Sequence, residues 1–149
     1  MSNSAVTVLV VDDRDIVRSG LKIALAGDDS VKIIGEAGSG HAAIKLCEEL
    51  QPDVVLMDLI MPEMDGLEAT RLICQANPEA KVIILTSFEN DSSVQDVLLS
   101  GARGYIAKNL LINELVDAIH CAKRGETIVS QVFVDNLKAA DSKPASANS

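Results

Sequence analysis

The stretch that decides the fold is Val54-Val-Leu-Met-Asp58-Leu-Ile-Met-Pro62-Glu-Met-Asp-Gly66. An apolar run of strand length ends on one carboxylate, Asp58, and Pro62 and Gly66 then break the backbone before an amphipathic segment begins. An acid therefore stands where a buried strand reaches the surface, which is costly for a charge unless other groups pair with it. We expect its partners at the ends of other strands.

The composition limits the classes of function that the chain can have. A length of 149 residues with 48% hydrophobic residues predicts one domain with a real core. The formal charge of −9 and the 2% aromatic content argue against direct binding of nucleic acid. The absence of a long apolar run or a basic, apolar leader predicts a cytoplasmic protein without a membrane span. The three widely spaced cysteines are expected to be buried free thiols.

Working outward from Asp58, short β-branched runs alternate with segments of helical periodicity. Strands are expected at 6–11, 31–36, 54–58, 81–85 and 104–107, and helices from Asp15, His41, Leu67, Val94 and Leu111. Strict alternation of five such units predicts an α/β fold with a parallel sheet covered on both faces. We expect the flavodoxin-like, doubly wound arrangement, with strand order 2-1-3-4-5.

The pattern weakens at both ends of the chain. Residues 1–5 are expected to be disordered and residues 6–125 to form the domain. Residues 126–137 are apolar enough for a short helix or an interaction segment, and the small polar residues 138–149 indicate a flexible linker or tail.

The ends of four strands carry the candidate site. Asp12 and Asp13 follow the first strand, Asp58 ends the third, Thr86 follows the fourth and Lys108 follows the fifth. Ligands of open parallel sheets bind beyond these carboxyl ends, near the switch in strand order. Three crowded carboxylates raise one another's cost of ionisation, and hard oxygen ligands without nearby His or Cys favour Mg²⁺. A metal, a carboxylate nucleophile, a cation and a hydroxyl together suit phosphoryl transfer.

These residues resemble the receiver domain of bacterial two-component response regulators over about residues 5–125. The resemblance rests on four pieces in order: Asp12-Asp13, Asp58 to Pro62 with Gly66, Leu85-Thr86-Ser87, and Gly101-Ala-Arg-Gly-Tyr105-Ile-Ala-Lys108. Two further pieces, Gly35-Glu-Ala-Gly-Ser-Gly40 and Ala122-Lys-Arg-Gly-Glu126, resemble the LuxR/NarL-type subfamily, in which a helix-turn-helix domain follows the receiver.

The resemblance implies that Asp58 accepts a phosphoryl group from a phosphohistidine on a sensor histidine kinase. Asp13 would bind Mg²⁺ directly and Asp12 through water, with the backbone carbonyl of Ile60 as a further ligand. The chain would be a signalling domain that catalyses its own phosphorylation and dephosphorylation, not an enzyme acting on a separate substrate.

The resemblance also implies a switch. Lys108 would pair with the phosphoryl oxygens, Thr86 would bond one of them, and Tyr105 would swing inward behind the displaced Thr86. The face formed by the fourth helix, fifth strand and fifth helix would change, with a homodimer as one outcome. DNA would be reached only through an output domain that this sequence does not contain.

The chain departs from the receiver pattern near the pocket. Asn109 follows the lysine where many receivers have a cis-proline, which leaves the Lys108–Asn109 bond open between cis and trans. Ile60 and Phe88, two residues after Asp58 and Thr86, are both apolar, so we expect altered access of water to the phosphate.

Two other functions remain open from the residues. One is a Mg²⁺-dependent phosphatase with an aspartyl-phosphate intermediate, although such enzymes carry a second acid at the position of Ile60. The other is an interaction module that works without phosphate, which costly clustered charges argue against. His41 and His120 are expected to be solvated side chains without a catalytic role.

Overall fold

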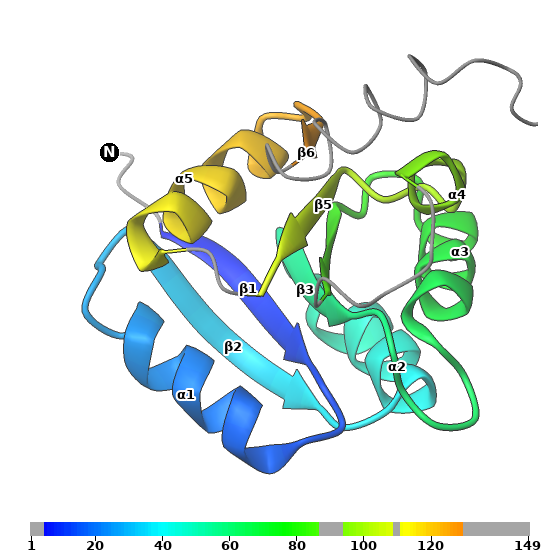
Figure 1. The fold of residues 1–149 in the computed structure, drawn as a ribbon, viewed down its shortest axis with the longest axis horizontal. Coiled ribbons are helices and arrows are strands. Elements are labelled where there is room, and N and C mark those ends of the chain that lie inside the picture. Colours follow the sequence, from blue (N-terminus) through cyan, green and yellow to red (C-terminus); the bar gives the residue numbers. More distant parts are fainter. Residues whose placement is uncertain (1–4, 87–93, 109–110, 130–149) are drawn as a thin grey trace, which may run out of the picture.

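The computed structural model describes residues 5–86, 94–108 and 111–129, in which strands and helices alternate along the chain (Figure 1). Its elements are β1 (Val6–Val11), α1 (Asp15–Leu25), β2 (Val31–Ala37), α2 (Gly40–Leu50), β3 (Val54–Asp58), α3 (Gly66–Ala76), β4 (Val82–Thr86), α4 (Val94–Leu99), β5 (Gly104–Ala107), α5 (Ile112–Lys123) and β6 (Ile128–Val129). The expected α/β alternation is confirmed, with boundaries that differ from the expected ones by about one residue.

The sheet contains six parallel strands in the order β2-β1-β3-β4-β5-β6. The predicted order of the first five strands is therefore correct, and the strand count of five is wrong by one. The sixth strand, Ile128–Val129, pairs with β5 in a segment for which a short helix was one expectation. Its backbone bonds to β5 explain the difference, because two β-branched residues beside an open strand edge extend the sheet.

The sheet separates two apolar layers. Val8 and Val10 of β1 face the layer that contains α1 and α5, whereas Leu9 and Val11 face the layer that contains α2, α3 and α4. Figure 1 shows these helices on the two sides of the sheet. The central strands β3 and β4 are buried along their whole length, as expected for strands covered on both faces.

The loop after β3 is held tightly against the strand. The Gly66 backbone N–H donates to the Leu59 carbonyl at 2.8 Å. A Cβ at position 66 would lie 2.3 Å from the Asp58 carbonyl oxygen, so only glycine fits at this approach. Asp65 then caps α3 by accepting from the Glu68 N–H, which begins the helix directly after the turn. The close packing fixes how the chain leaves Asp58.

The remaining expectations concern the ends of the chain, its thiols and membranes. Residues 1–4 and 130–149 lie outside the described part, and so do the expected tail and most of the segment 126–137. Cys47, Cys74 and Cys121 are free, as predicted, but half-buried rather than buried. None of the helices in the described ranges combines the length and apolar character needed to cross a bilayer.

Candidate functional site

The carboxyl ends of β1, β3, β4 and β5 meet at one edge of the sheet and form an open pocket. Asp58 closes β3 opposite Leu85, and Thr86 closes β4 opposite Ala107, so the register brings the predicted residues together. The pocket has a volume of about 380 Å³ and is lined by Asp13, Arg14, Asp58, Ile60, Thr86 and Lys108.

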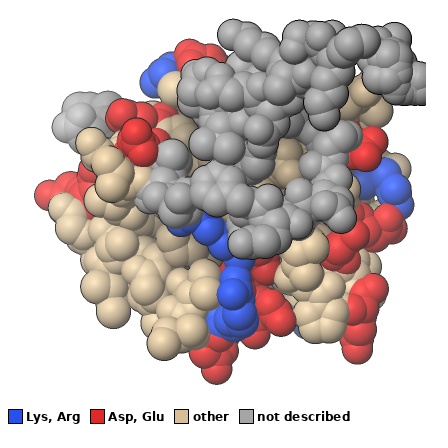
Figure 2. Space-filling model, in the orientation of Figure 1, with Lys and Arg blue, Asp and Glu red and all other residues tan. Residues whose placement is uncertain are grey.

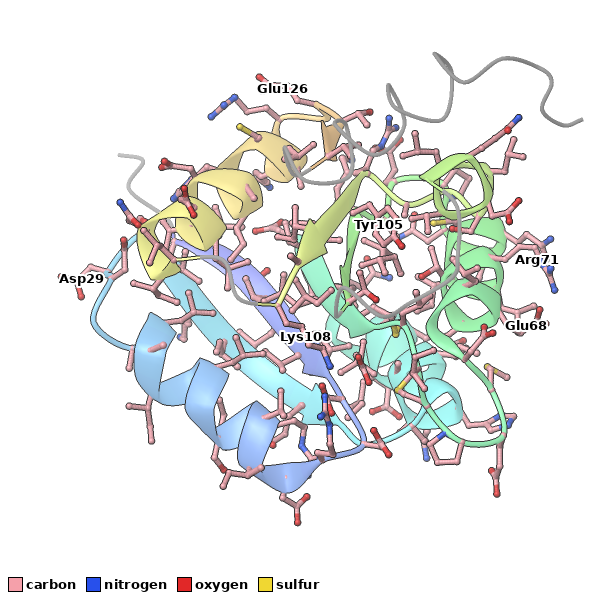
Figure 3. The ribbon with its side chains drawn as sticks, in the orientation of Figure 1. Asp29, Glu68, Arg71, Tyr105, Lys108 and Glu126 are labelled. Atoms are coloured by element: carbon pink, nitrogen blue, oxygen red, sulfur yellow. The ribbon has the colours of Figure 1, made fainter. Side chains whose placement is uncertain are left out.

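Asp58 and Lys108 form the central ion pair of this pocket. The Lys108 Nζ lies 2.6 Å from Asp58 Oδ1, although the two residues are 50 positions apart. Figure 3 shows the Lys108 side chain reaching from the end of β5 toward the carboxyl end of β1. Its backbone N–H donates to the Thr86 carbonyl at 2.8 Å, which fixes the start of the side chain.

The ion pair with Lys108 does not fully offset the energetic cost of burying the Asp58 charge. The Asp58 side chain is only 5% exposed. Burial raises its pKa above the ordinary value, the hydrogen bond and charge of Lys108 oppose the rise, and the negative charge of Asp12 adds to it. Additional positive charge in the pocket would therefore stabilise the ionised form of Asp58.

The acid cluster fits a divalent cation such as Mg²⁺. Asp12, Asp13 and Asp58 each offer one carboxylate oxygen, and these oxygens lie within 4.8 Å of one another. Cis and trans ligands of one octahedral Mg²⁺ shell are about 3 and 4 Å apart, so three facial oxygens need only small movements. The buried Asp12 accepts Lys108 Nζ at 3.3 Å, and the exposed Asp13 leaves the site open to solvent.

Thr86 lines the pocket and Tyr105 lies on the neighbouring strand β5, and each is 1% exposed. Tyr105 packs in the apolar layer of α2, α3 and α4, where Figure 3 shows it inside the fold. The residue expected to swing inward is therefore already inside here. Burial raises the pKa of its hydroxyl. Ser87, Phe88 and Asn109, and with them the Lys108–Asn109 bond, lie outside the described residues.

Ile60 occupies the mouth of the pocket, with 64% of the residue exposed. The expected effect of this apolar side chain on the access of water to a phosphate stays a prediction. The role of its carbonyl as a metal ligand stays a prediction.

Two arginines of the site were not predicted. Arg14 lies against Asp12, with Nε 3.3 Å from Oδ1. Arg18 donates from Nη1 to the Asp12 carbonyl at 2.5 Å and from Nε to Glu36 at 2.8 Å, and so ties the end of β1 to β2. Arg14 directly follows the acid pair, a placement that could have marked it as part of the same edge.

The surface around the site carries both signs of charge. Figure 2 shows a short band of Lys and Arg atoms bordered by Asp and Glu atoms. His120, by contrast, lies away from the pocket on α5, where its Nε2 is 2.8 Å from Ser30 Oγ. His120 is half-buried there rather than fully solvated, and it is not among the residues that line the pocket.

Comparison with known proteins decides the family. The sequence model described as the response regulator receiver domain matches residues 8–120. The chain belongs to this family. The receiver domain is of the LuxR/NarL type, and its relatives are response regulators, a class of signalling proteins. Receiver domains bind Mg²⁺ at an acidic pocket, which here corresponds to the cluster of Asp12, Asp13 and Asp58.

Two curated relatives and one solved structure illustrate the similarity. The receiver is 44% identical over 121 residues to the transcriptional regulatory protein LiaR of Bacillus subtilis (strain 168), covering 81% of the chain and 57% of LiaR. It is 40% identical over 144 residues to the response regulator GacA of Pseudomonas viridiflava, covering 97% and 67% of the two chains. The crystal structure of a LuxR-family two-component response regulator from Aurantimonas sp. SI85-9A1 superposes with a TM-score of 0.85 at 29% identity, covering 94% of this chain and all of that one. The receiver thus spans 57–67% of the length of the two curated relatives.

Proposed function

We propose that this receiver accepts a phosphoryl group on Asp58 from the phosphohistidine of a sensor histidine kinase, in a Mg²⁺-dependent reaction. The observation that carries the proposal is the placement of Asp58. Its carboxylate lies in an open pocket, 2.6 Å from a lysine and beside two further acids that can hold a cation. That arrangement provides a nucleophile together with the charges that phosphoryl transfer requires.

The transfer exchanges one bond to phosphorus for another. A carboxylate oxygen of Asp58 forms the new P–O bond while the P–N bond to the donor imidazole breaks, and the electron pair of that bond returns to the imidazole. Asp12, Asp13, Asp58 and the Ile60 carbonyl would hold Mg²⁺, which would supply positive charge that offsets repulsion between the carboxylate and the phosphoryl oxygens. Lys108 donates to a phosphoryl oxygen, since its Nζ already lies at the Asp58 carboxylate.

The reverse half of the cycle is hydrolysis by the receiver itself. Water attacks phosphorus, the bond to Asp58 breaks, and inorganic phosphate leaves a free carboxylate. The exposed apolar side chain of Ile60 lies at the mouth through which this water arrives. The rate of hydrolysis therefore depends on the size and polarity of residue 60.

The output is a change of surface. Thr86 moves to a phosphoryl oxygen, and this movement favours the inward position that Tyr105 already occupies here, which fixes the arrangement of the face built by α4, β5 and α5. Leu99 on α4 and Leu111 before α5 are 76% and 65% exposed, so this face has apolar side chains for a partner or a second receiver.

Control of transcription is the proposed result of this change. The curated relative LiaR is named a transcriptional regulatory protein. The receiver has a formal charge of −9, which disfavours contact with DNA phosphates, so DNA is bound through a separate output domain. The setting is the cytoplasm, where such a regulator meets both kinase and DNA.

The test uses acetyl phosphate as a small phosphodonor with Mg²⁺, read by intact-protein mass spectrometry. The wild-type receiver should gain one phosphate, and Asp58→Asn should gain none. Asp53→Asn, a matched change at the other end of β3, should gain phosphate like wild type. Equal phosphate on Asp58→Asn and wild type would refute the assignment of Asp58. Rapid, repeated release of phosphate from varied substrates would indicate a phosphatase instead.

A further inference from the structure

Arg14 is the cation of the pocket to which the receiver resemblance gives no role. It follows the acid pair as the N-cap residue of α1, in an extended backbone conformation with φ −103° and ψ 120°. Its backbone N–H donates to Asp12 Oδ1 at 2.9 Å, and its Nε lies 3.3 Å from the same oxygen. Its Nη2 is 3.5 Å from Asp12 Oδ2, so the guanidinium covers the carboxylate.

The two side chains of this pair differ strongly in exposure. The Arg14 side chain is 54% exposed, whereas that of Asp12 is 3% exposed. The guanidinium can therefore leave the carboxylate for solvent, whereas Asp12 stays in place. Negative charges of Asp12, Asp58 and Asp13 all help to raise the pKa of Arg14, with the hydrogen bond to Asp12 the largest cause. All three acids of the cluster thus act on this one guanidinium.

Charge balance gives Arg14 different partners before and after phosphorylation. Among the described residues that line the pocket, Lys108 and Arg14 are the cations that face the three carboxylates, and a divalent cation held through Asp12 competes with Arg14 for its negative charge. An aspartyl phosphate carries about two negative charges. Together with Asp12 and Asp13 it is balanced by a divalent cation, Lys108 and Arg14, and one negative charge is left over if Arg14 is absent. The forked guanidinium also matches phosphate oxygens better than an ammonium does.

We propose that Arg14 is an exchangeable substrate-binding residue: it pairs with Asp12 before a divalent cation binds, then turns to the phosphate oxygens of the phosphodonor at the mouth of the pocket. This proposal rests on the proposed phosphorylation of Asp58. It predicts that Arg14 weakens the binding of Mg²⁺ and promotes the transfer that follows.

The first measurement is the affinity for Mg²⁺ alone, by isothermal titration calorimetry. Arg14→Gln should bind Mg²⁺ about threefold more tightly than wild type, because the competing cation is gone. Arg71→Gln is the matched control, since Arg71 pairs with Glu68 on the far side of α3 and does not line the pocket (Figure 3). Its Mg²⁺ affinity should equal that of wild type.

The second measurement is the rate of phosphorylation by acetyl phosphate at saturating Mg²⁺. Arg14→Gln should react about tenfold more slowly than Arg71→Gln, because a charge-assisted contact to phosphate is lost. Arg14→Lys keeps the charge without the fork and should fall between them. Tighter Mg²⁺ binding together with slower transfer in Arg14→Gln supports the proposal.

Contrary results separate the two proposals. Unchanged Mg²⁺ affinity in Arg14→Gln, or a transfer rate equal to that of Arg71→Gln, overturns the role of Arg14 and leaves phosphorylation of Asp58 intact. Absence of phosphate on the wild-type receiver refutes the proposed function itself, and with it the phosphate contact of Arg14.

Discussion

The two ends of β3 carry the same pair of residue types in opposite circumstances. Asp53 precedes the strand and lies 2.8 Å from Lys123, and Asp58 ends it and lies 2.6 Å from Lys108. Asp53 also exchanges backbone and side-chain hydrogen bonds with Thr7 and remains 28% exposed. Asp58 is 5% exposed and faces another acid.

The pKa values of the two acids move in opposite directions. Burial acts to raise the pKa of Asp53, but the hydrogen bonds from Lys123 and Thr7 outweigh it, and the result lies below the ordinary value. Burial is also the largest influence on Asp58, and there Lys108 does not overcome it, so its pKa is raised. The aspartate–lysine pair at Asp53 therefore stabilises the fold. The pair at Asp58 leaves the negative charge of the carboxylate incompletely compensated.

The largest expected effect separates the two lysines by function. Lys108→Met should slow phosphorylation by acetyl phosphate about a hundredfold, because a donor to the transferring phosphoryl oxygens is lost. Lys123→Met should react within about twofold of wild type, because Lys123 pairs with Asp53 at the opposite edge of the sheet and does not line the pocket. Mass spectrometry over a time course measures both. Equal slowing in the two variants would abolish the functional distinction between the ends of β3.

A second effect concerns divalent cations, which should act at the Asp58 end alone. Mg²⁺ at ten times its dissociation constant should raise the free energy of unfolding of wild type and of Asp53→Asn by about 1.4 kcal/mol. The gain should be smaller in Asp58→Asn, because one of three carboxylates is missing. Urea unfolding with Mg²⁺ and with EDTA provides the comparison. Equal gains in all three proteins would place the cation elsewhere.

A third effect is a difference in the sign of stability changes at pH 7 without Mg²⁺. Asp58→Asn should raise the free energy of unfolding by about 1 kcal/mol, because it removes an incompletely compensated charge. Asp53→Asn should lower it by about 1 kcal/mol, because it removes the charge partner of Lys123. Urea midpoints followed by circular dichroism test both variants. Changes of the same sign would show that the two pairs are energetically alike.

The smallest effect is the pH dependence of the stability changes in Asp58→Asn and Asp53→Asn. Since the pKa of Asp53 is lowered, its contribution is present above about pH 4, the ordinary pKa, and is lost as pH falls through the folded value. Since that of Asp58 is raised, its ionisation destabilises the fold only as pH rises above about 4. The stability gain of Asp58→Asn should therefore grow from pH 4 toward 7 in urea titrations. A gain that shrinks over this range would contradict the raised pKa.

The sequence was sufficient to predict which side chains meet at this edge of the sheet, because the order of parallel strands determines which strand ends are neighbours. Once strands and helices alternate, the carboxyl ends of the strands share one edge, and Asp12, Asp58 and Lys108 must come together there. The sequence did not distinguish Arg14 from an ordinary surface arginine, because backbone direction at a helix cap decides whether the side chain turns toward the acids. The buried position of Tyr105 was not predicted either, since an aromatic in a strand can be accommodated inside or outside.

The sixth strand has a mechanical consequence. Val129 is the register partner of Tyr105, and the Ile128 N–H donates to the Arg103 carbonyl at 2.8 Å. The last two described residues therefore form a strand in register with β5 and its buried tyrosine. Any displacement of the β5 backbone must therefore either carry β6 with it or break the β5–β6 pairing.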